Sequence, residues 1–177
     1  MSDANNEQLR PPPSWDKFEE ICADLFSRIW KDNQLVRYGR AGQRQHGVDI
    51  YGKDSGADAA VQCKGKRDWP PTKLTIPEID AEIQEAKKFN PPLSTYILAT
   101  TADNDVYITD HVNAVSAKHA EQGLFRVCPT NVSTDGWNFG DSACGRGGAF
   151  LSARTVPQLS WGTHPGKQAS KCLNLSN

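Results

Sequence analysis

Two short apolar runs lie within residues 47–65 and are separated by a polar segment that contains a glycine. Apolar runs of this length on either side of a turn predict a β-hairpin. The turn is expected near Ser55 or Gly56, and a centre between the two sets Asp49 opposite Gln62. A slip of one residue would move these side chains to different faces, so the position of the turn decides the pairing.

The second run carries polar side chains on one face of this hairpin. Successive side chains of a strand point to opposite faces, so Gln62 and Lys64 share one face while Val61 and Cys63 share the other. Directly opposed residues have their Cβ atoms about 4.5–5.5 Å apart. We therefore expect the Asp49 carboxylate, an amide oxygen and an ammonium to form one polar patch, with an apolar pair on the reverse side.

The rest of the chain predicts an alternation of helices and strands. Apolar residues recur at helical spacing at about 15–30 and 76–89. A third helix is expected at about 106–122, between a turn at 100–104 and Gly123 as its C-terminal stop. Short apolar runs predict three more strands, at about 35–38, 96–99 and 124–128. The order α-β-β-β-α-β-α-β requires at least one parallel crossover in its second half. We expect an α/β protein with a mixed central sheet flanked by helices.

Composition divides the chain into one folded domain and two flanking segments. Residues 1–13 are polar, end in three prolines and are expected to be disordered, whereas 14–128 can form one domain with a core. Residues 129–177 hold six charged residues and seven of the 14 glycines, with no helical stripe or strand-like alternation. We expect a loop-rich or disordered tail, either an accessory segment or an aberrant end from a shifted reading frame or a truncation. The encoding DNA, read in another frame, would distinguish the two.

Targeting signals and cysteines narrow the class of protein. No apolar run approaches the roughly 18 residues of a membrane span and no apolar leader follows a basic start, so we expect a cytoplasmic protein without a membrane partner. The five cysteines are an odd number without a CxxC pair. We expect reduced thiols, and the spacing supports neither a disulfide framework nor a zinc site.

The formal net charge of −1 hides a basic segment. Between residues 37 and 67, seven Lys and Arg stand against three Asp. The loop before the hairpin is also rich in Gln and Arg, which suit hydrogen bonds to phosphates and base edges. The candidate DNA contacts are Arg40, Gln43, Arg44, Gln45, His46, Lys66 and Arg67. A solvated loop is the alternative, and a surplus of four charges does not decide between the two.

Several motifs occur together in the expected domain. Phe-Glu at 18–19 opens the first helix, residues 40–50 end in Gly-Val-Asp-Ile, and Val-Gln-Cys-Lys at 61–64 precedes a helix and a buried strand. Over residues 15–128 these motifs resemble the restriction-endonuclease-like superfamily with the PD-(D/E)xK motif, and within it the Mrr-type and defence-associated nucleases. The resemblance implies a restriction-endonuclease-like core and a metal-dependent DNA endonuclease of the restriction or anti-phage defence type.

The resemblance also implies a set of site residues. The family combines a helix Glu, a strand Asp and an acidic or Gln-x-Lys pair on the next strand, which here match Glu19, Asp49, Gln62 and Lys64. Glu20 is the alternative to Glu19. The residue before Asp49 is Val rather than Pro, a common departure in the subfamily. Gln62 in place of an acid removes one negative charge from the metal shell, which favours a single-ion site over a two-ion site.

The chemistry of phosphodiester hydrolysis agrees with this residue set. A hard divalent cation activates water and neutralises charge at phosphorus. Mg²⁺, or Mn²⁺ in its place, takes oxygen ligands and retains waters, so one or two carboxylates suffice. In this interpretation Asp49 is the chief ligand, Glu19 binds directly or through water, and Gln62 offers its carbonyl oxygen. Lys64 orients or deprotonates the attacking water and stabilises the developing charge.

Two other functions would use the same core differently. A Holliday-junction resolvase would act as a symmetric dimer, and a catalytically inactive module would bind DNA without cutting it. The presence of both Asp49 and Lys64 favours an enzyme. Double-stranded DNA is the expected partner, while a homo-oligomer and a fused or separate regulatory subunit are implied by the resemblance alone.

Overall fold

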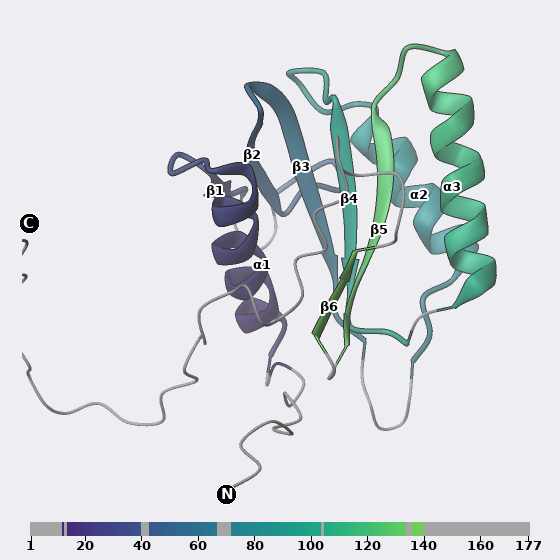
Figure 1. Ribbon diagram of the computed structural model, residues 1–177, viewed down its shortest axis with the longest axis horizontal. Coiled ribbons are helices and arrows are strands. Elements are labelled where there is room, and N and C mark those ends of the chain that lie inside the picture. Colours follow the sequence, from purple (N-terminus) through teal and green to yellow (C-terminus); the bar gives the residue numbers. More distant parts are fainter. Residues whose placement is uncertain are drawn as a thin grey trace, which may run out of the picture.

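The computed structural model describes residues 12, 14–39, 43–66, 72–103, 105–133 and 136–139. Within these residues the chain forms helices and strands in this order (Figure 1): α1 (Trp15–Trp30), β1 (Val36–Arg37), β2 (Ile50–Asp54), β3 (Ala57–Lys64), α2 (Ile76–Ala86), β4 (Thr95–Thr100), α3 (Val106–Glu121), β5 (Arg126–Ser133) and β6 (Gly136–Phe139). The order of the elements as far as β5 is the one that the sequence predicts. The fold is α/β, with a mixed sheet flanked by helices.

The described strands form one sheet whose spatial order follows the sequence, from β1 to β6. β2 pairs antiparallel with both β1 and β3, whereas β3, β4 and β5 run parallel to one another. β6 returns antiparallel to β5. α2 connects β3 to β4 and α3 connects β4 to β5, which gives two parallel crossovers. Both crossovers step across the sheet in the same direction, so with the usual right hand both helices cover the same face.

The sheet has an apolar core on each face. On one face α2 and α3 cover a cluster that includes Ala60 and Leu98. On the other face, α1 contributes Phe26 to a cluster with Val61 and Cys63. Figure 1 shows α1 on the opposite side of the sheet from α2. Alternate residues of β3 therefore serve the two cores, and the prediction that Val61 and Cys63 share the apolar face is confirmed.

The hairpin of β2 and β3 closes through a two-residue turn. Ser55 and Gly56 have φ angles of 53° and 86°, and positive φ at both central residues is typical of the type I′ turn that suits hairpins. The two strands pair in the register centred between these residues. Continued by one residue past the Ile50–Val61 pair, this register sets Asp49 against Gln62, and the predicted centre of the turn is confirmed.

Replacing Gly56 by alanine should lower the free energy of unfolding by about 1–2 kcal/mol, because an L-residue is strained in the left-handed region. A Cβ atom here would meet no other atom within 4 Å, so the change tests backbone strain alone. Gly56→Asn is the matched control, since asparagine tolerates positive φ, and it should cost less. Urea unfolding measures both variants; a Gly56→Ala protein as stable as the wild type would contradict the turn.

The last strands differ from the sequence prediction. β5 continues past Cys128 to Ser133, and β6 pairs with its second half, so the expectation that the last strand ends at residue 128 is wrong. Backbone pairing forms these strands at the end of the sheet without the apolar alternation by which strands are found in a sequence. The predictions for residues 1–11 and 140–177 concern residues outside the described part of the chain.

Cysteine chemistry also differs in one place. Cys22 and Cys63 are buried free thiols, as expected. Cys128 takes part in a disulfide, so the prediction of reduced thiols is wrong for this residue.

None of the described helices has the length and apolar character needed to span a bilayer.

Candidate active site

Asp49 lies immediately before β2 and is 8% exposed. Its Oδ2 atom accepts two hydrogen bonds from β3, one from Gln62 Nε2 and one from the backbone N–H of Cys63, each 2.7 Å long. The backbone N–H of Asp49 donates to the carbonyl oxygen of Val61 at 3.0 Å. The hairpin register brings Asp49 to β3, and these three contacts hold its carboxylate and its backbone against that strand.

Burial raises the pKa of Asp49 from its ordinary value of 3.8 to about 6. The hydrogen bond from the Cys63 backbone acts in the opposite direction and lowers this pKa. The negative charges of Glu19 and Glu82 raise it, while the ammonium of Lys64 lowers it. Four neighbours thus set the ionisation of one buried carboxyl, an arrangement that is enriched at functional sites.

Only one of the two polar atoms of the Gln62 side-chain amide has a hydrogen-bond partner among the described residues. Nε2 donates to Asp49, whereas Oε1 is buried and has no hydrogen-bond partner among the described residues. If the amide were flipped, Oε1 would face the Asp49 carboxylate, and two acceptors cannot form a hydrogen bond. Nε2 therefore faces Asp49, and Oε1 is the atom without a donor. A buried acceptor without a donor costs about 1–3 kcal/mol, and Oε1 is therefore suited to accept a ligand.

Glu19 reaches the site from α1, on the other face of the sheet. Its side chain is 17% exposed and its charge raises the pKa of Asp49. Both oxygens already have partners: Oε2 accepts from Arg37 of β1 at 3.0 Å, and Oε1 accepts from the indole N–H of Trp15. The structure brings Glu19 close to Asp49 but engages it in other contacts.

The structure distinguishes Glu19 from Glu20. Glu20 is 49% exposed and pairs with Lys17 at 2.9 Å on the outer surface of α1. Of the two carboxylates, only that of Glu19 is among the main influences on the pKa of Asp49. Glu19 is therefore the helix carboxylate that belongs to the candidate site.

Lys64 points to the face of the sheet covered by α2. Its ammonium donates to Glu82 Oε1 on α2, and the two side chains are 17% and 21% exposed. Glu82 is not among the site residues predicted from the sequence, although one signal pointed to it. Glu78, Glu82 and Glu85 recur at helical spacing along one side of the expected helix.

Most of the described candidate DNA contacts also pair with carboxylates of α2. Lys66 Nζ lies 2.7 Å from Glu78 Oε2. His46 Nδ1 lies 3.5 Å from Glu85 Oε2, and the guanidinium of Arg44 lies 4.0 Å from the same oxygen. The polar loop and the end of β3 thus meet along one helix.

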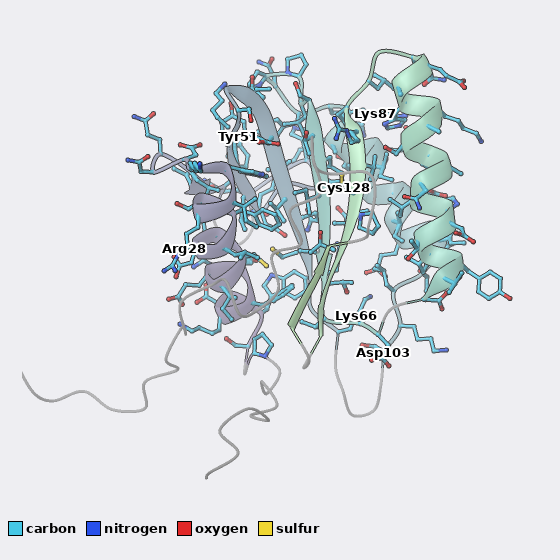
Figure 2. All side chains as sticks on the ribbon, viewed as in Figure 1. Arg28, Tyr51, Lys66, Lys87, Asp103 and Cys128 are labelled. Atoms are coloured by element: carbon cyan, nitrogen blue, oxygen red, sulfur yellow. The ribbon has the colours of Figure 1, made fainter. Side chains whose placement is uncertain are left out.

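The remaining candidate DNA contacts are placed less fully. Gln43 is exposed and Gln45 is half-buried in the loop before the hairpin. Arg40 and Arg67 lie outside the described residues. Lys66 follows the carboxyl end of β3 and lies at the same end of the sheet as Asp103, which follows β4 (Figure 2).

The candidate metal ligands are few. Among the described residues, no cluster of three or more His, Cys, Asp or Glu side chains could hold a metal ion. The oxygens that fit a cation are Gln62 Oε1, which lacks a donor, and the Asp49 carboxylate, whose bonds from β3 both fall on Oδ2. Hard oxygen atoms of this kind suit Mg²⁺ or Mn²⁺. A third oxygen, from Glu19, would have to exchange its present partners.

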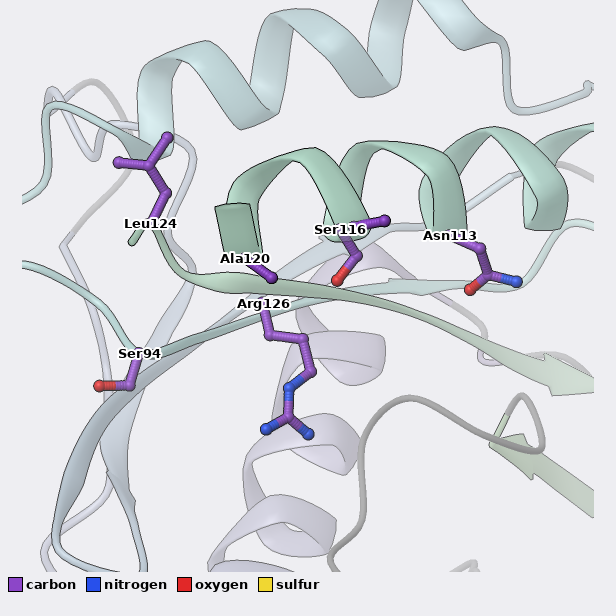
Figure 3. Close-up of a pocket in the computed structure, with 7 residues that line it drawn as sticks. Ser94, Asn113, Ser116, Ala120, Leu124 and Arg126 are labelled. Carbon is purple, nitrogen blue, oxygen red and sulfur yellow. The ribbon is translucent and has the colours of Figure 1, made fainter. Parts of the chain in front are cut away.

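A separate cavity of about 650 Å³ lies at the amino ends of β4 and β5 (Figure 3). Its lining comes from α3 and the two adjoining loops and strands: Ser94, Asn113, Ser116, Ala117, Ala120, Leu124 and Arg126. The candidate active site is instead at the carboxyl end of β3. The two share no residue, so this cavity contributes nothing to the Asp49 site.

No family model, curated protein or solved structure matches this chain. The geometry of these side chains and the resemblance of their motifs are therefore the grounds for inferring a function.

Proposed function

We propose that this protein is a divalent-metal-dependent endonuclease that hydrolyses phosphodiester bonds in double-stranded DNA. The observation that carries the proposal is the arrangement of Asp49, Gln62 and Lys64. A buried carboxylate is held by β3, the amide that holds it leaves an unpartnered oxygen, and an ammonium follows two residues later. This arrangement is compatible with a PD-(D/E)xK site of the Mrr type, and a restriction or defence role is part of the proposal.

Asp49 and Gln62 are the residues that would hold the cation. When bound, the cation supplies an activated water and neutralises charge on the phosphate. The amide leaves the site with one buried carboxylate fewer than an acidic residue would, so the described residues support a single-ion site. Glu19 is a further ligand, directly or through water, only after Arg37 and Trp15 release it.

Lys64 supplies a positive charge from the protein itself, in addition to that of the cation, to the developing negative charge on the phosphate. An ammonium held in a partly buried site is worth more to a developing negative charge than the same group in water. Its place on the Asp49 face of β3 suits it to orient the attacking water and to stabilise the phosphate in the transition state.

The basic residues around the site suit the approach of DNA. Lys66, Arg44 and His46 lie along α2, in contact with its carboxylates. DNA phosphates would compete with the α2 carboxylates for these three basic side chains. DNA binding should weaken steeply as the salt concentration rises, because each phosphate contact releases counterions.

Plasmid cleavage tests the proposed function. The wild type should convert supercoiled plasmid to nicked and linear forms in Mg²⁺ or Mn²⁺. EDTA, which chelates these ions, should stop the cleavage. Asp49→Ala should lower the rate by about 10²–10³-fold, because both the ligand and its hydrogen bonds are lost. Asp54→Ala is the matched control, since Asp54 lies at the far end of β2 from Asp49 and contacts Ser55 rather than the site, and it should cut at the wild-type rate.

The other outcomes separate the alternatives. Cutting that survives both EDTA and Asp49→Ala would contradict the metal-dependent mechanism. Salt-sensitive DNA binding by a wild type that never cuts would support the inactive DNA-binding module. Cleavage of four-way junctions in preference to plasmid would support the resolvase.

A further inference from the structure

Glu82 reaches from α2 into the candidate active site. Its Oε1 accepts a hydrogen bond from Lys64 Nζ, and the two side chains are mostly shielded from water. An ion pair in such a place is screened less by solvent and salt than a surface pair. The negative charge of Glu82 also raises the pKa of Asp49. Lys64 therefore lies among carboxylates that come from two different elements.

The second carboxylate oxygen of Glu82 is confined by the loop before β2. A Cβ atom at Gly47 would lie 2.9 Å from Glu82 Oε2 and 3.1 Å from the Glu82 carbonyl oxygen, so the backbone of Gly47 packs directly on Glu82. The carbonyl oxygen of Gly47 accepts a 2.7 Å hydrogen bond from the hydroxyl group of Tyr96, a fully buried residue. Glu82 is thus held between Lys64 and an anchored loop.

An ammonium that acts at one point must give up its conformational freedom. A lysine side chain has many rotamers to lose, and a misplacement of about 1 Å can cost roughly 10²-fold in rate. The contact with Glu82 removes this freedom before any substrate binds. Glu78, one turn earlier on α2, makes the corresponding contact with Lys66. Lys66 follows the end of β3, and among the described residues that ion pair makes no hydrogen bond to Asp49 or Gln62.

We propose that Glu82 is a positioning residue of the active site, which fixes the Lys64 ammonium beside Asp49, where negative charge develops on the scissile phosphate. This inference rests on the proposed nuclease function. The competing explanation is a purely structural ion pair that joins α2 to β3. A structural pair would affect stability but not turnover.

Two isosteric variants distinguish these explanations. Glu82→Gln and Asp80→Asn each remove one negative charge from α2, but Asp80 pairs with His111 of α3 at 2.7 Å and does not touch Lys64. Glu82→Gln should lower kcat for plasmid cleavage by about 10–100-fold, with KM for DNA changed less than about threefold. Asp80→Asn should keep the wild-type kcat. Glu82→Asp retains the charge and should recover part of the loss; it also replaces Glu82→Gln in the comparison if that variant does not fold.

A second measurement is independent of cleavage. In protein labelled with ¹³C at lysine Cε, the Lys64 signal is assigned by its disappearance in Lys64→Met. Relaxation should show an ordered Lys64 Cε in the wild type and in Asp80→Asn, and a mobile one in Glu82→Gln.

Each result decides between the explanations. An unchanged kcat in Glu82→Gln, or a Lys64 Cε that is as mobile in the wild type as in Glu82→Gln, overturns the positioning role while cleavage by the wild type sustains the proposed function. A wild type that never cuts DNA overturns the proposed function, and an ordered Lys64 in that protein is then a structural ion pair only.

Discussion

The Asp49→Asn protein is expected to be more stable than the wild type at pH 7 and to have lost metal-dependent DNA cleavage. At that pH the wild type keeps a buried carboxyl ionised although burial raises its pKa to about 6. Asparagine is nearly isosteric, can accept both hydrogen bonds from β3 through its carbonyl oxygen, and carries no charge. A shift of this size corresponds to about 3 kcal/mol, so we expect a gain of about 1–3 kcal/mol.

The pH dependence of this gain follows from the direction of the shift. Between about pH 4 and 6 the folded protein binds a proton at Asp49 that the unfolded chain has already released. The contribution of Asp49 to the free energy of unfolding therefore falls as the pH rises through this window and stays low above it. Urea unfolding at pH 4, 5 and 7 should show the advantage of Asp49→Asn growing with pH.

Asp58 provides a control of opposite sign. Hydrogen bonds from Lys53 and Tyr51 lower the pKa of Asp58, so its charge is favourable in the folded protein. Asp58→Asn should lower stability at pH 7. If Asp49→Asn lowers it to the same extent, the carboxylate of Asp49 is not the buried, disfavoured charge described above.

Lys64→Met is expected to lower kcat by about 10²–10³-fold, the usual cost of removing one group that stabilises transition-state charge. Methionine keeps most of the length and volume of the lysine stem but has no ammonium. DNA binding should weaken only slightly, because Arg44 and Lys66 remain. Single-turnover cleavage and DNA titration at the same salt concentration measure the two effects separately.

The same substitution leaves Glu82 without its cation. A largely buried carboxylate that loses its partner should cost about 1–3 kcal/mol of stability. Combining Lys64→Met with Glu82→Gln removes the unpaired charge and should restore most of the stability without restoring cleavage. Recovery of cleavage in the double variant would contradict the role assigned to Lys64.

The hairpin part of the site could be predicted from the sequence because its geometry is local. Two turn residues fix the register, and the strict alternation of strand side chains then determines which groups share a face. The contact of Gln62 with Asp49 follows from these two facts, whereas the bond from the Cys63 backbone depends on the conformation of the Asp49 side chain. The apolar stripe of α1 likewise gave the bounds of that helix.

The other contacts depend on packing between distant segments, which spacing does not encode. Lys64 ends β3 and Glu82 lies on α2, within the crossover connection that follows, and only the rotation of α2 about its own axis brings the carboxylate to the ammonium. The contacts of Glu19 with Arg37 and Trp15 similarly depend on how α1 lies across β1. β6 escaped prediction because its pairing with β5 uses backbone groups, which every sequence offers.

The amide of Gln62 has a consequence for how this protein would experience a shortage of divalent ions. A glutamate at this position would set a second carboxylate against Asp49, and without a cation the two charges would repel inside the fold. With the amide, the metal-free chain keeps a hydrogen bond at that place. In the proposed enzyme, the supply of Mg²⁺ would then control when DNA is cut without controlling whether the protein is folded.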